Sequence, residues 1–289
     1  MAQEIAQSPY RAALQKAVAD AYAAAPAQVS PQLEVCDCDC CVDAPTLARM
    51  VATPPRDMPP YLVQEYSNSA HGVPTRLADL SAFLPRYLDL MARGEEVDTV
   101  GVAVELHRFG DAVFAGNWPP EPLRAAYHDW AAAYLLHCGW IEADPRAEDA
   151  LSAPAYLFEM LPRGGIPAAL VTQALDDLFA LTDRGQMALA QFLMFLGQEV
   201  KGDWFDLYAL GPVPQAERTH LADWLNALLT SERAQALVTD PDFEWPEFIR
   251  YGNPPGPVPG FWQGYAAKAV ALGGGLTWLD LSEKPARRD

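Results

Sequence analysis

Residues 9 to 24, PYRAALQKAVADAYAA, decide the fold class because their apolar positions recur with the period of an α-helix. The larger apolar side chains are spaced four residues apart and fall on one helix face: Leu14, Val18 and Tyr22. Small residues lie beside them: Ala13, Ala17 and Ala21. Ser8 followed by Pro9 is typical of a capping residue and the first position of a helix. The stretch therefore predicts a close-packed helix.

The same spacing recurs between clusters of proline, which separate the periodic segments without interrupting them. We expect further helices over residues 46–51, 60–67, 77–92, 99–109, 121–137, 145–161, 167–181, 185–200, 217–229, 231–238, 245–251 and 261–272. Alternation typical of a strand occurs only at Val100–Leu106, where a capping residue before the stretch favours a helix equally. The sequence thus predicts an all-α fold, an irregular multi-helical globule of about a dozen short helices. A HEAT-like helical array is the alternative, although no fixed-period repeat is present.

The chain has 289 residues, 51% of them hydrophobic, which is enough for a sizeable core. No segment has the composition of a linker, so we expect a single all-α domain over residues 1–281. The loops at 139–145 and 211–214 are the expected hinges. The polar tail at 282–289 is expected to fray.

The charge is strongly acidic, with 20 Lys and Arg against 38 Asp and Glu, a net charge of −18. Such a chain repels phosphate backbones and anionic membranes, so we expect neither nucleic acid nor a membrane as a partner. A basic protein partner fits the charge better. The longest apolar stretch, Met187–Leu196, has about half of the roughly 20 residues that a membrane-spanning helix needs. The start of the chain has no basic region followed by an apolar one, so we expect a cytoplasmic protein.

Four of the five cysteines lie within six positions: Cys36, Cys38, Cys40 and Cys41. The spacing of Cys38 and Cys41 allows a turn to bring two thiolates onto one ion, which makes zinc or copper(I) a sensible cofactor. A further ligand would have to come from His71 or Cys138, or from the neighbouring His137. Reduced thiols that pack a loop, or a redox-sensing disulfide, are the alternatives. The interleaved aspartates raise the pKa of the thiols, which argues against a catalytic cysteine.

Other signatures of chemistry are weak. Glu217 and His220 form one Glu-x-x-His match, but a helical di-iron site needs two on different helices. Nucleotide-binding loops, hydrolase elbows and zinc-protease helices are absent from the sequence. Eight tryptophans could line a ligand pocket, although large rings more often pack helices together. The pair Asp176 and Asp177 is expected on a solvated helix face.

Three segments together resemble a family of uncharacterised bacterial proteins. They are the cysteine cluster with TPPRDMP at 53–59, FLPRYLDL at 83–90, and WPPE at 118–121. The likeness covers about residues 33 to 137. Similar proteins often carry a Thr-Trp-Gly element where this chain reads HGVP at 71–74. The resemblance implies an all-helical fold and a recurring thiol cluster, and it supplies no catalytic residues.

These observations favour a helical interaction protein, an adaptor or an inhibitor, whose acidic surface attracts a basic partner. A metal-thiolate protein is the first alternative. An enzyme with a Trp-lined pocket is the second, because helical enzymes need not contain short motifs.

Overall fold

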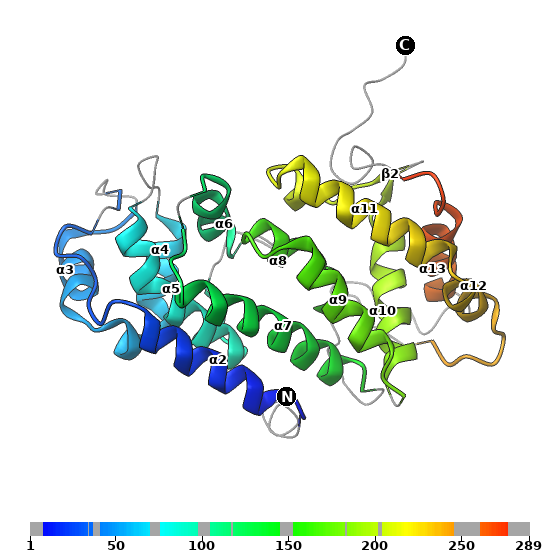
Figure 1. Ribbon diagram of the computed structural model, residues 1–289, viewed down its shortest axis with the longest axis horizontal. Helices are drawn as coiled ribbons and strands as arrows, with labels where there is room; N and C mark the ends of the chain where they lie inside the picture. Colours follow the sequence, from blue (N-terminus) through cyan, green and yellow to red (C-terminus); the bar gives the residue numbers. More distant parts are fainter. Residues whose placement is uncertain are drawn as a thin grey trace, which may run out of the picture. The chain divides into compact units, whose positions relative to one another are not determined.

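The computed structural model describes residues 8–33, 35–36, 41–69, 76–97, 105–116, 118–144, 153–182, 184–201, 204–245 and 261–276. Within these ranges the protein is built from α-helices joined by turns (Figure 1). It also contains two short 3₁₀ helices and one pair of β-strands of two residues each. The predicted all-α, multi-helical fold is therefore confirmed. No described helix has the length and apolar character needed to cross a membrane.

The elements follow one another in the order α2 (Arg11–Ala24), α3 (Ala44–Ala52), η1 (Pro55–Asp57), α4 (Pro60–Asn68), α5 (Leu77–Ala92), α6 (His107–Phe114), α7 (Leu123–Glu142), α8 (Ala153–Arg163), α9 (Ala168–Phe179), α10 (Gly185–Gln198), β1 (Val200–Lys201), β2 (Trp204–Phe205), η2 (Tyr208–Leu210), α11 (Gln215–Thr230), α12 (Glu232–Thr239) and α13 (Phe261–Ala271). The two strands pair antiparallel, with Val200 opposite Phe205.

The chain divides into two compact units. Unit 1 comprises residues 1–8, 135–162 and 167–289, and unit 2 comprises residues 9–134 and 163–166. Whether the two units behave as the one domain expected over residues 1–281 stays a prediction, as do the hinges. Of the helix expected over 245–251, residues 246–251 lie outside the described residues, as does the tail at 282–289.

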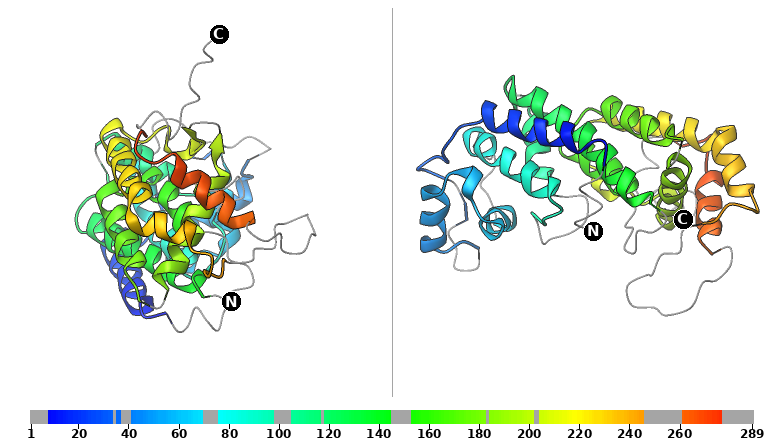
Figure 2. Two further views of the ribbon diagram at one scale, coloured as in Figure 1. Left: turned by 90° about the vertical axis from the view of Figure 1, so that its right-hand side faces the viewer. Right: turned by 90° about the horizontal axis from the view of Figure 1, so that it is seen from below.

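Helix α5 forms the centre of unit 2, and α2 lies alongside it (Figure 2). Nearly every side chain of α5 from Asp79 to Leu88 is buried. The ring of Phe83 stacks on Tyr66 of α4, with ring centroids 3.9 Å apart. Trp130 of α7 donates from Nε1 to the carbonyl oxygen of Leu88 at 3.1 Å. Together with α2, the helices α4 and α7 therefore surround this buried part of α5.

Helix α10 has the same central role in unit 1, where α9 and α13 pack against it. It comes close to α13 at Gly197, where an added Cβ would lie 1.8 Å from the carbonyl oxygen of Tyr265. Phe192 of α10 meets the rings of Phe158 and Trp224 edge to face. Aromatic contacts therefore fill the core between α8, α10 and α11.

Some predicted boundaries are wrong. The first helix begins at Arg11, after a turn at Pro9 and Tyr10, so Ser8 is not its cap. The helix expected to end at His137 continues through Gly139 to Glu142. Leu178 packs closely on Gly139, where an added Cβ would lie 2.4 Å from it. Gly139 therefore permits close packing and does not terminate the helix or begin a loop.

Two further boundaries differ from expectation. Residues 99–104 of the helix predicted over 99–109 lie outside the described residues; in the rest, Glu105 and Leu106 form a turn, and the helix covers His107–Phe114. Val200 was expected at the end of a helix but belongs to β1, because α10 ends at Gln198.

Candidate functional site

The cysteine segment lies only partly within the described residues. Cys36 and Cys41 are half-buried, and so is Cys138. Cys38, Cys40 and His71 fall outside the described ranges. Within those ranges, no three or more His, Cys, Asp or Glu side chains come together in a way that could hold a metal ion. The expected zinc or copper site therefore stays a prediction.

Asp43, next to the cysteine segment, has a structural use. Its carboxylate accepts a hydrogen bond from the backbone N–H of Thr46 at 2.7 Å and caps α3. Hydrogen bonds from Thr46, first from its side chain and then from its backbone N–H, lower the pKa of Asp43.

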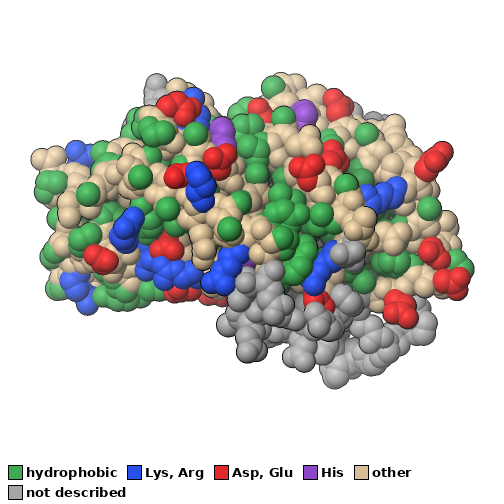
Figure 3. All heavy atoms as spheres, turned by 60° about the horizontal axis from the view of Figure 1, so that its bottom comes forward, with side chains coloured by type: hydrophobic (Ala, Val, Ile, Leu, Met, Phe, Trp, Pro, Cys, Tyr) green, Lys and Arg blue, Asp and Glu red, His purple; other side chains and the backbone are tan. Residues whose placement is uncertain are grey.

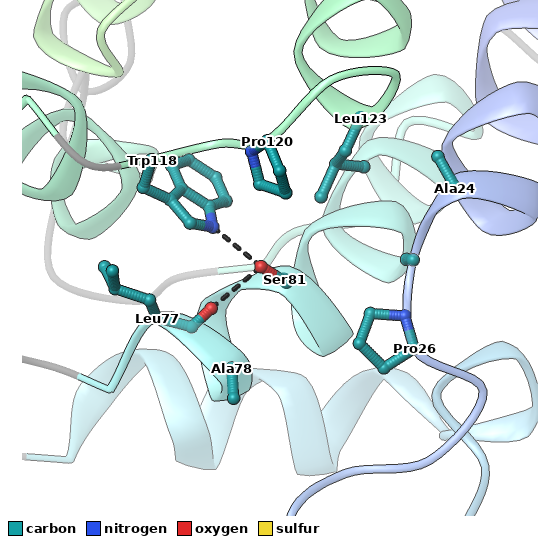
Figure 4. Close-up of a pocket in the computed structure, with 9 residues that line it drawn as sticks. Ala24, Pro26, Leu77, Ala78, Ser81, Trp118, Pro120 and Leu123 are labelled. Carbon is teal, nitrogen blue, oxygen red and sulfur yellow. Dashed lines mark hydrogen bonds between the residues drawn. The ribbon is translucent and has the colours of Figure 1, made fainter.

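Unit 2 contains an apolar groove of about 480 Å³ (Figure 4). Nine residues line it: Ala24, Ala25, Pro26, Leu77, Ala78, Ser81, Trp118, Pro120 and Leu123. Trp118 donates from Nε1 to Ser81 Oγ at 2.8 Å, and Ser81 donates in turn to the carbonyl oxygen of Leu77 at 2.8 Å. No lining side chain is titratable, so this groove offers no acid or base to an enzyme.

The other expected Trp and His features serve packing. Trp224 of α11 donates from Nε1 to Asp176 Oδ1 at 3.1 Å, and Arg184 lies over the ring of Trp140 at 3.6 Å. His220 bonds to Thr172 at 3.0 Å, and Glu217 accepts the backbone N–H of Ala168 at 2.6 Å. Glu217 and His220 therefore tie α11 to α9.

The acidic charge is unequally divided between the units. Unit 1 contains 10 Lys and Arg against 22 Asp and Glu, whereas unit 2 contains 10 against 16. On the one face drawn in Figure 3, acidic and basic side chains are interspersed. The difference in charge between the two units therefore lies in which acidic and basic side chains each unit exposes.

Among the described residues of unit 1, seven acidic side chains are exposed: Asp176, Asp177, Asp223, Glu232, Asp240, Asp242 and Glu244. Among the same described residues of unit 1, only three basic side chains are exposed: Lys201, Arg233 and Lys268. None of the seven carboxylates is within ion-pair distance of a described Lys or Arg. Asp176 and Asp177 lie on the solvated face expected from the sequence.

The described surface of unit 2 is closer to balance, with seven exposed carboxylates and six exposed Lys and Arg. Several of its acidic residues pair with arginines. Arg163 binds Asp111 at 2.7 Å, and Arg86 binds Asp89 at 2.7 Å. Unit 2 thus neutralises part of its own charge, whereas the seven exposed carboxylates of unit 1 have no such ion pair among the described residues.

A buried carboxyl group that no sequence motif indicates lies in unit 1. Glu159 of α8 is only 5% exposed, and its Oε2 atom has no hydrogen-bond partner among the described residues. Burial, and then the negative charge of Glu199, raise its pKa to about 8. The signal for it was a single acid within the apolar run YLFEML at 156–161.

No protein-family model, curated protein or solved structure matches the chain. The resemblance to an uncharacterised bacterial family stays a prediction.

Proposed function

We propose that the protein is a cytoplasmic interaction module, an adaptor or an inhibitor, that binds a basic protein through the acidic surface of unit 1. The observation that carries this proposal is a set of exposed carboxylates on α9, α11 and α12 and the turn after α12, none of them within ion-pair distance of a Lys or Arg among the described residues. Carboxylates without such a cation keep their charge for a partner.

Part of this surface is on two helices in contact, α9 and α11. Asp176 and Asp177 of α9 and Asp223 of α11 are exposed, and the Trp224–Asp176 hydrogen bond fixes the two helices side by side. We call these three residues the α9–α11 acidic face. A basic helix or loop with Lys or Arg at matching spacing is the partner that this face suits.

Affinity capture from cell extract tests the proposal when it compares matched variants. The test variant combines Asp176→Asn, Asp177→Asn and Asp223→Asn, which keep the side-chain volume and remove three charges. The control combines Glu65→Gln, Glu96→Gln and Asp129→Asn, which remove three exposed charges from unit 2. We expect a stoichiometric basic protein with the wild type and the control, and its loss with the test variant. Equal capture by both variants would refute the acidic-face proposal.

A metal-thiolate function is the second proposal, because Cys36 and Cys41 at the two ends of the cluster are half-buried and retain access to solvent. In this proposal, zinc or copper binds Cys36, Cys38, Cys40 and Cys41. Elemental analysis of protein purified without chelator, with a thiol titration of the same sample, tests it. Stoichiometric metal with protected thiols is expected, and metal content unchanged by replacing all four cysteines with serine would refute it.

A further inference from the structure

After α13 has ended, the chain is fixed to α11 at Leu276. The side chain of Asn226, in α11, donates from Nδ2 to the carbonyl oxygen of Leu276 at 2.6 Å. Its Oδ1 atom accepts the backbone N–H of Leu276 at 3.0 Å. The side chain of Leu276 is buried. Two hydrogen bonds and a buried side chain therefore anchor the chain on α11 at the last residue of this described range.

The residues before this anchor show the direction in which the chain runs along α11. An added Cβ at Gly273 would lie 2.8 Å from Leu229, near the end of α11. Three residues later, Leu276 is bonded to Asn226, which lies almost one helical turn closer to the start of α11. A chain continued in this direction points toward Asp223, because residues three apart lie on the same side of a helix. Asp223 is exposed and belongs to the α9–α11 acidic face.

The sequence beyond residue 276 contains a dense group of positive charges. Residues 284–288, KPARR, include Lys284, Arg287 and Arg288 and no acidic residue; we call them the basic stretch. Arg287 and Arg288 are the only adjacent pair of Lys or Arg in the chain. The acidic face carries three carboxylates without a described Lys or Arg within ion-pair distance. The stretch and the face are therefore complementary in charge.

The basic stretch is close enough in sequence to the anchor to reach the acidic face. Lys284 follows Leu276 by eight residues, which span about 26 Å when extended. Asp223 lies only about 5 Å from Asn226 along the helix axis. A tether of this length holds the stretch at a local concentration in the millimolar range. Even a weak contact, with a dissociation constant of about 1 mM, would therefore be substantially occupied.

We propose that the basic stretch binds the α9–α11 acidic face of its own chain and competes there with the basic partner. The contact within the chain needs no partner, whereas the competition rests on the function proposed above. The contact does not require the stretch to fold, because exposed charges act over about 10 Å at 0.1 M salt. It is therefore compatible with the fraying expected for residues 282–289.

Carbodiimide cross-linking of the full chain measures the contact, because the reagent joins an amine directly to a carboxylate. Lys284 is the only lysine after Lys268, so its links are identified by peptide mapping of the monomeric product. At about 50 mM salt we expect Lys284 to be joined mainly to the three carboxylates of the acidic face, and at about 300 mM the yield should fall at least threefold.

Three exposed carboxylates beyond α12 are the internal reference for these links: Asp240, Asp242 and Glu244. They belong to the same unit, but α12 follows the end of α11 that lies away from Asp223. Equal links from Lys284 to this reference set, or links to the acidic face that salt does not change, would overturn the inference.

Matched charge variants test whether the positive charges drive the contact. Arg287→Gln combined with Arg288→Gln removes two charges and leaves Lys284 and every carboxylate in place. The yield of links to the acidic face should fall at least about threefold in this variant. Arg11→Gln combined with Arg49→Gln removes two exposed charges from unit 2 and should leave the yield unchanged. Equal yields in the two variants would refute the contact.

Binding of hexalysine, as a defined basic probe, tests the competition. The variant with Arg287→Gln and Arg288→Gln should bind hexalysine about two- to fivefold more tightly than the wild type, because the tethered competitor is weakened. This gain should disappear when Asp176, Asp177 and Asp223 are also replaced with Asn. Unchanged affinity, or a gain that persists without the acidic face, would refute the competition.

The failure of this inference is distinguishable from the failure of the proposed function. If no basic protein is captured from cell extract, the proposed function is refuted, while cross-links from Lys284 to the acidic face would still establish the contact within the chain. If those cross-links do not form, the inference is refuted whatever protein is captured.

Discussion

Arg86 of α5 donates from Nε to the carbonyl oxygen of Met58 at a distance of 2.7 Å. The donor belongs to FLPRYLDL and the acceptor to TPPRDMP, two of the segments on which the family resemblance rests. The third segment also reaches α5, where Trp118 donates to Ser81. All three segments therefore meet on one helix of unit 2.

Replacing Arg86 with Met should destabilise the protein by about 2 to 4 kcal/mol, because it removes a buried hydrogen bond and leaves Asp89 with one cation fewer. Chemical denaturation measures the loss. Arg49→Met, at an exposed position, is the control and should change stability by less than about 0.5 kcal/mol. Equal effects of the two substitutions would contradict the structural role of Arg86.

Two helical glycines in unit 1 form a matched pair. Gly197→Ala should destabilise the protein by more than about 2 kcal/mol, because the new Cβ would meet the backbone of Tyr265. Gly264→Ala, with no atom within 4 Å of the added Cβ, should stabilise it by up to about 1 kcal/mol. Thermal unfolding of both variants tests the close packing of α10 on α13. Changes of the same sign and size would show that the helices are further apart.

The hydrogen bond at the floor of the groove should be visible in a double-mutant cycle. Ser81→Ala leaves the buried Trp118 N–H without its acceptor and should cost about 1 to 3 kcal/mol. Once Trp118 is replaced with Phe, the same Ser81→Ala change should cost less. Additive effects would mean that the two side chains are not coupled.

Global stability should depend on pH through Glu159. The pKa of Glu159 is raised on folding, so the buried neutral form contributes stability below pH 4.5 that is lost as pH rises towards 8. The wild type should therefore lose up to about 1.4 kcal/mol per pH unit relative to Glu159→Gln in this window. Urea unfolding of both proteins at pH 5, 6.5 and 8 provides the comparison. Parallel curves would show that Glu159 has the same pKa in the folded and unfolded states.

Much of the fold is visible in the sequence because periodicity and tertiary packing agree. Helix α5 has the bounds predicted for it, Leu77 to Ala92, even with Pro85 inside, since its apolar positions are nearly continuous. The errors in predicted helix boundaries occur where a residue packs against a part of the chain that is distant in sequence, which local sequence preferences do not predict. The helix propensity of glycine predicts a helix end at Gly139. In the structure, Gly139 lies within α7, and Leu178 packs against it.

The sites are less predictable from the sequence. The net charge is a sum over the sequence and does not say where the charges lie. The carboxylates of unit 1 that have no described Lys or Arg within ion-pair distance can be identified only from the folded structure. Glu159 stands out in an apolar run, but its neighbour Glu199 is 40 positions away in the chain, and only the fold brings the two together.

The central claim, binding of a basic partner by unit 1, is tested most directly by the salt dependence of binding to the captured protein. We predict that wild-type affinity falls at least tenfold between 50 and 300 mM salt, since exposed charges are screened over about 10 Å at 0.1 M. The Asp176, Asp177 and Asp223 variant should bind at least tenfold more weakly at low salt, with a shallower salt dependence, while the unit 2 control follows the wild type. Binding that is insensitive to salt, or equally weakened in both variants, would contradict the claim.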